Sequence, residues 1–111
     1  MSTNRFILDK KASWRWTTVT TATTLTAEET ANGFVVVSGN VAATLPVASE
    51  AMKGNTCLIA ASHASGCTIV VAAGFGGAGS GSDTLTLAQG QMALVGCDGD
   101  YWYALHVAAA A

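Results

Sequence analysis

The sequence has few charged residues. Only 11% of its 111 residues are charged, against about 25% in an average soluble domain, whereas 50% are hydrophobic. A small domain is mostly surface, so either partner subunits cover some faces or Thr, Ser and Gly residues carry the solvation. Continuous apolar runs favour partner subunits, because a lone two-layer sandwich should alternate apolar and polar residues. These runs are residues 34–37, 57–61, 68–73 and 92–95.

Long hydrophobic segments are also missing. No run approaches the ~20 apolar residues that cross a bilayer. The apolar part of the N-terminus is too short for a signal peptide and is interrupted by charge. We therefore expect a soluble protein that is made in the cytoplasm and has no membrane partner.

The cysteines form an odd set without Cys-x-x-Cys spacing: Cys57, Cys67 and Cys97. Each lies in or beside an apolar run, which predicts free, buried thiols. A disulfide between two of them stays open, since sequence alone cannot choose a pair. A zinc site that combines them with His63 or His106 lacks the usual ligand spacing.

No motif for catalysis or cofactor binding stands in a supporting context. Residues 74–79 match G-x-G-x-x-G, but a strand-like run follows where a dinucleotide fold needs a helix. Asp83, Asp98 and Asp100 offer oxygen ligands for calcium, yet Asp98-Gly99 is explained as a hairpin turn. No nucleophile is fixed beside a base. We therefore predict no enzyme activity, no cofactor and no metal.

Short β-type runs are what the sequence does contain. Turn signals recur every 8–12 residues and no long helical pattern occurs, which predicts an all-β fold. We expect an antiparallel sandwich or barrel of about seven short strands. A single helical turn is predicted where Thr26 precedes Glu29 at capping-box spacing.

The C-terminal quarter is the clearest part of the pattern. Residues 84–87 alternate Thr and Leu, and Asp98-Gly99 separates an apolar run from an aromatic one, so the chain should end in an antiparallel hairpin. Tyr101 and Tyr103 would share one strand face and Trp102 the other, which excludes a flat three-ring platform for sugars. We assign five residues of this region to the core or to a trimer contact: Leu85, Leu87, Leu94, Trp102 and Tyr103.

The N-terminus differs in charge from the rest. Residues 1–16 hold four of the five basic residues and one acid, a net charge of +3, whereas the remainder carries −5. One interpretation is a basic, aromatic arm that docks on an acidic neighbour; the other is a first strand with Trp14 and Trp16 on one face. Nucleic-acid binding is disfavoured, because four basic side chains in a protein of net negative charge neutralise few phosphates. The arm residues are Arg5, Phe6, Lys10, Lys11, Trp14, Arg15 and Trp16.

An ordered series of short motifs resembles a small β-domain of bacteriophage virion proteins, found in tail fibres and in head-decoration or head-fibre proteins. The series runs through residues 25–33, Ala43-Thr-Leu-Pro46, residues 54–59, Thr68-Ile-Val70, the Gly-rich loop, residues 84–87, Ala93-Leu-Val95 and residues 98–103. The resemblance covers residues 25–107, which defines a β-domain between an N-terminal arm or linker at 1–24 and a tail at 108–111.

The resemblance implies a non-enzymatic, trimer-forming module of the virion. Its expected partners are two further copies of the chain and the major capsid protein or another virion protein. Fibre chains need long shafts, so the short length favours a capsid decoration (cement) or head-fibre protein over a tail protein, with the arm holding the capsid. The alternative is a tail-fibre or tail-tip domain that binds host glycans through loops such as residues 74–82.

Overall fold

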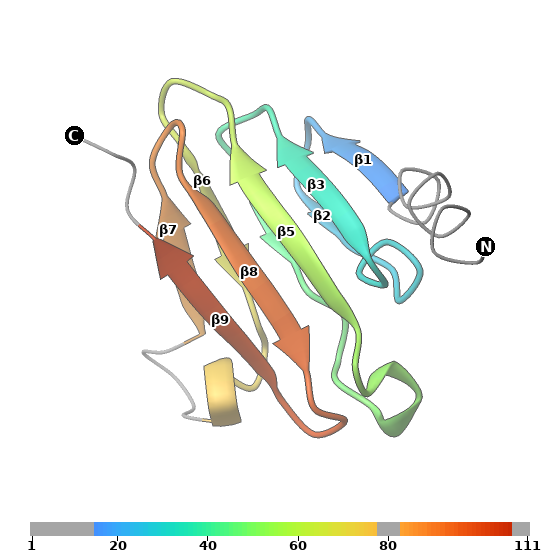
Figure 1. The fold of residues 1–111 in the computed structure, drawn as a ribbon. Helices are drawn as coiled ribbons and strands as arrows, with labels where there is room; N and C mark the ends of the chain where they lie inside the picture. The colour runs from blue at the N-terminus through green and yellow to red at the C-terminus, as the bar shows by residue number, and fades with distance from the viewer. Residues whose placement is uncertain (1–14, 78–82, 108–111) are drawn as a thin grey trace.

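Two packed β-sheets form the protein in the computed structural model, which describes residues 15–77 and 83–107 (Figure 1). The five-stranded sheet has the order β1-β3-β5-β8-β9 and the four-stranded sheet the order β2-β4-β6-β7. Within these ranges there are two short 3₁₀ turns and no α-helix. The elements are β1 (Arg15–Val19), β2 (Thr23–Thr24), β3 (Gly33–Val37), β4 (Ala42–Thr44), η1 (Glu50–Met52), β5 (Thr56–Ala61), β6 (Cys67–Val70), η2 (Phe75–Gly77), β7 (Thr84–Leu87), β8 (Met92–Cys97) and β9 (Trp102–Val107).

The chain alternates between the sheets through its first six strands. As a result β1, β3 and β5 run parallel in one sheet, and β2, β4 and β6 run parallel in the other. Only β7, β8 and β9 pair antiparallel with their neighbours. The all-β prediction is confirmed, but the prediction of antiparallel sheets is wrong: both sheets are mixed, because each early connection crosses to the opposite sheet before it returns.

Residues 15–24 belong to the sheets. The sequence placed them in the arm or linker, but β1 pairs with β3 and β2 pairs with β4. Each is the first described strand of its sheet, so β-structure is present from residue 15 onward, before the predicted boundary at residue 25. Of the two interpretations of the N-terminus, an arm or a first strand, the strand is the one that holds for Arg15 and Trp16.

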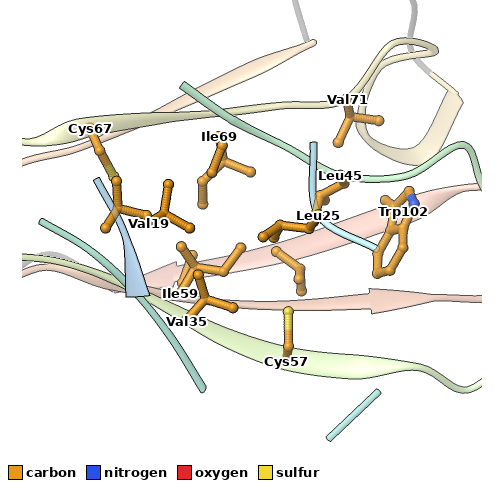
Figure 2. Packing of buried hydrophobic residues seen from close by; sticks show 14 of the residues in the cluster. Val19, Leu25, Val35, Leu45, Cys57, Ile59, Cys67, Ile69, Val71 and Trp102 are labelled. Carbon is orange, nitrogen blue, oxygen red and sulfur yellow. The ribbon is translucent and has the colours of Figure 1, made fainter. Parts of the chain in front are cut away.

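The core is the layer between the sheets, to which both contribute alternate side chains (Figure 2). In β3 and β5, for example, Val35 and Ile59 are fully buried while their neighbours along the strand are half-buried. Trp102 closes one end of the layer, where its indole N–H donates to the Pro46 carbonyl oxygen at 2.7 Å. The β-branched residues of these strands fit the pleated, buried surface.

The predicted packing residues divide between two faces. Leu87 and Trp102 lie in the core as expected, and Leu85 packs against it. Leu94 and Tyr103 are not core residues: their side chains are 38% and 49% exposed on the outer face of the five-stranded sheet. A continuous apolar run does not reveal which of its residues point inward.

Several local predictions are confirmed. The Thr26 N–H donates to Glu29 Oε1 at 2.9 Å, and the Glu29 N–H donates to Thr26 Oγ1 at 3.1 Å. This reciprocal capping box encloses a single turn, with the Thr30 N–H donating to the Thr26 carbonyl. The C-terminal hairpin is present, although its tip is Gly99-Asp100, one residue later than predicted; Gly99 has φ of +100°.

Replacement of Ile59 by Ala tests the position of the core. We expect Ile59→Ala to lower the free energy of unfolding by about 2–5 kcal/mol, because the side chain is fully buried and its removal leaves a cavity. The matched control is Thr86→Ala on the exposed face of β7, with an expected loss below about 1 kcal/mol. Urea titration at one fixed protein concentration measures both, and equal losses would contradict the assignment.

Candidate interaction surfaces

A row of apolar side chains crosses the outer face of the five-stranded sheet. Strand register places one large apolar residue from each strand in line, and we call this set the apolar row: Trp16, Phe34, Leu58, Leu94 and Leu105. Neighbours in such a row lie about 5 Å apart and pack on one another. The row therefore forms one continuous apolar band across five strands.

The rest of this outer face carries no charge in the part of the chain that the structure describes. Alternation and burial place uncharged residues on either side of the apolar row. These residues are Thr18, Val36, Thr56, Ala60, Met92, Gly96 and Tyr103. A broad exposed apolar face on a small protein indicates a contact with another protein.

A ridge stands at the β1 side of this face. The ring of Trp16 stacks on that of Phe34, with centroids 5.0 Å apart and planes at 6°. The indole N–H donates to Thr18 Oγ1 at 3.2 Å, which holds the ring in place. Trp16 is 66% exposed. We call this pair the Trp16 ridge.

A shallow depression lies at the β8–β9 side of the same face. It has a volume of about 370 Å³, and its floor includes Gly96. A Cβ atom at Gly96 would make only ordinary van der Waals contacts, at 3.8 Å from the Asn55 carbonyl oxygen and 3.9 Å from Thr56 Oγ1, so a side chain can be placed there without a clash. We call it the Gly96 depression; Thr56, Leu94, Tyr103 and Leu105 surround it.

The outer face of the four-stranded sheet is different, because threonine dominates it. Register aligns Thr24, Thr44 and Thr84 with Val70 in one row, and Thr68 and Thr86 with Ala42 in the next. Their hydroxyl groups can hydrogen-bond to water. The second explanation for the scarcity of charge, solvation by residues such as threonine, therefore fits the outer face of the four-stranded sheet.

The predicted arm residues are only partly described. Arg5, Phe6, Lys10, Lys11 and Trp14 lie outside the described residues. Arg15 and Trp16 are exposed residues of β1, and the Arg15 N–H donates to the Asn32 carbonyl oxygen at 3.0 Å. The structure thus brings Trp16 beside Phe34, a partner that the sequence did not indicate.

The described histidines make local contacts. The Ser65 N–H donates to His63 Nδ1 at 3.0 Å, whereas His106 Nε2 lies 3.1 Å from Gln91 Oε1. Within residues 15–77 and 83–107, no group of three or more His, Cys, Asp or Glu side chains is arranged to hold a metal ion. A cleft of about 80 Å³ beside Trp102 is lined mainly by small and apolar residues.

The tip of the C-terminal hairpin is an ordered polar turn. Asp98 Oδ1 accepts hydrogen bonds from the N–H groups of Asp100 at 2.9 Å and Tyr101 at 2.8 Å. The Tyr101 and then the Asp100 backbone hydrogen bonds lower the pKa of the Asp98 carboxyl. A hydrogen bond to Asp98 in turn raises the pKa of Tyr103. The two aspartates thus have a structural use in the turn.

Glycines of η2 lie against the tyrosines of this hairpin. A Cβ atom at Gly76 would come within 3.3 Å of the Tyr103 ring, and one at Gly77 within 2.8 Å of the Tyr101 ring. Both glycines also have positive φ. This part of the Gly-rich loop therefore packs on the hairpin, while residues 78–82 lie outside the described residues.

The three cysteines are free and buried, as the sequence predicted. Burial raises the pKa of Cys57 to about 12 and also raises that of Cys67. Figure 2 shows Cys57 and Cys67 far apart in the core, on different sheets.

Most residues of the apolar outer face could not be identified from the sequence. Phe34, Leu58, Gly96 and Leu105 were not singled out, and their alignment depends on register between strands distant in sequence. The only available signal was that the runs at 34–37 and 57–61 are apolar on both faces.

Comparison of the chain with models of known protein families, with curated proteins and with solved structures gives no match. In the part that the structure describes, no helix has the length and apolar character needed to cross a membrane.

The Asp98 turn predicts loss of stability in acid. A folded-state pKa below the unfolded value means that Asp98 contributes stability above the unfolded pKa of about 4, and that this contribution disappears as the pH falls through the folded value. In Asp98→Asn, which keeps the Oδ1 acceptor without the charge, thermal unfolding should change less between about pH 4 and 2. Identical pH profiles for the two proteins would contradict the assignment.

The buried thiols predict slow labelling of the native protein. At pH 8 we expect Cys57 to react with a thiol reagent on the order of a thousandfold more slowly than an exposed cysteine, because little thiolate is present at a pKa of about 12. In denaturant without reductant, three thiols per chain should react. A count of one would instead reveal a disulfide.

Proposed function

We propose that this protein is a non-enzymatic structural protein of a bacteriophage virion, a trimeric capsid decoration (cement) or head-fibre protein. The observation that carries the proposal is the uncharged outer face of the five-stranded sheet, with Leu94 38% and Leu105 62% exposed. Exposed apolar area of this extent is stabilised when other subunits cover it. Self-association also accounts for the scarcity of charge in the sequence.

The position of β1 supports a role for the N-terminal segment in anchoring. Because β1 is an edge strand that begins at Arg15, residues 1–14 join the module at the border of the five-stranded sheet. Residues 1–16 carry +3 and the remainder −5. The basic segment is therefore suited to an acidic surface of the major capsid protein or of another virion protein.

The alternative is a tail-fibre or tail-tip domain that binds host glycans. Tyr101 and Tyr103 are 41% and 49% exposed at the hairpin and could stack on a sugar ring. However, the backbone of Gly76 and Gly77 already lies against these rings. The capsid proposal therefore has the stronger support.

Deletion of residues 2–14 tests the anchoring role. We expect the shortened protein to bind capsids at least about tenfold more weakly, because it loses three of the five basic side chains. It should keep the same number of subunits per oligomer, since β1 is intact. Co-sedimentation with capsids that lack the protein measures binding, and light scattering measures mass.

The matched control is Lys53→Glu, which reverses the one basic residue outside residues 1–16 and should leave capsid binding unchanged. Full co-sedimentation of the deleted protein would overturn the anchoring role.

A further inference from the structure

We propose that the Trp16 ridge of one copy inserts into the Gly96 depression of a second copy. This inference rests on the self-association proposed above and names the residues that make the contact. Ridge and depression lie on the same outer face, at the β1 side and the β8–β9 side respectively.

The two features are complementary in shape. Trp16 is 66% exposed although its ring is held by Phe34 and Thr18, so little ordering is lost when it is buried. The depression of about 370 Å³ includes Gly96 in its lining, where a side chain would make only ordinary contacts and would occupy part of the space. A large, rigid aromatic side chain that enters an apolar pocket is typical of the residues that dominate interface energies.

The chemistry of the face favours a second copy of the chain as the occupant. No described residue that points outward from the five-stranded sheet is charged. A partner that brought a charge to this face would bury it without a counter-ion, at a large cost in free energy. A second copy brings the same uncharged surface together with its own Trp16 ridge, an apolar projection that can enter the depression.

The positions of the two features limit the kinds of symmetry that the contact allows. The ridge on β1 and the depression on β8 and β9 are separated by β3 and β5, a distance of about 14–19 Å at the usual strand spacing. Because both features lie on one face, two copies can exchange them reciprocally about a twofold axis, whereas copies that do not reciprocate form a closed ring or an open filament. A ring of three copies satisfies every ridge and every depression, as a twofold pair also does, and the proposed trimer corresponds to the ring.

Two substitutions separate the ridge from the depression. Trp16→Ala removes the ridge and leaves the depression, whereas Gly96→Trp fills the depression and leaves the ridge. A Cβ atom at residue 96 meets its neighbours only at ordinary contact distances and the residue lies on the outer face, so Gly96→Trp should fold. We expect each variant alone to fall from three times the chain mass to a single 11.2 kDa chain by light scattering. An unchanged β-type circular dichroism spectrum at low temperature checks that the chain is folded, because the midpoint of thermal unfolding itself falls when subunit contacts are lost.

Mixing the two variants provides the decisive measurement. The intact Trp16 of the Gly96→Trp chain can enter the intact depression of the Trp16→Ala chain, but no further contact can form. We therefore expect an equimolar mixture to contain a one-to-one heterodimer of twice the chain mass. The matched control is Thr68→Trp, on the outer face of the four-stranded sheet, which should keep the wild-type mass.

The outcomes distinguish this inference from the proposed function. Variants that keep the wild-type mass, or folded single chains that stay single when mixed, would overturn the ridge-in-depression contact and leave the trimeric virion protein standing. A wild-type chain that is itself a monomer at all concentrations would overturn both.

Discussion

The layer of apolar side chains between the two sheets is the contact on which the rest of the structure depends. From β1 to β6 the chain adds strands to the two sheets alternately, and the inward residues Val35, Ile59 and Ile69 meet in the same layer. Burial of this layer fixes the alternation of every strand, because a slip of one residue would turn the apolar side chains outward. The same constraint decides which residues of each strand lie on the outer face of its sheet.

The two outer faces divide the solvation of the protein between them. Threonine covers the four-stranded sheet, where Thr44 and Thr68 present hydroxyl groups. The five-stranded sheet instead presents the apolar row, the Trp16 ridge and the Gly96 depression. A module with one wet face and one apolar face can expose the former and associate through the latter, which is the physical basis of the proposed role as a virion structural protein.

The parts that sequence predicted well are those in which the decisive residues are close in the chain. The Thr26–Glu29 capping box and the hairpin of β8 and β9 depend on contacts within a few residues, and both are present. Leu94 was placed in the core or in a trimer contact, but only pairing with Leu58 and Leu105 shows that it faces outward. The direction of the early strands could not be predicted, since parallel and antiparallel strands share the same period of two.

The sequence by itself determined that the chain forms short β-strands, that Leu87 and Trp102 are packing residues of the core or of a subunit contact, and that few charged residues are available to solvate its surface. These properties depend on composition and local pattern. Only the tertiary structure decided that the early strands pair in parallel, that Trp16 belongs to a strand, and that five residues distant in sequence align in the apolar row. The reason is that register between strands far apart in sequence is set by packing of the whole core, which no local segment contains.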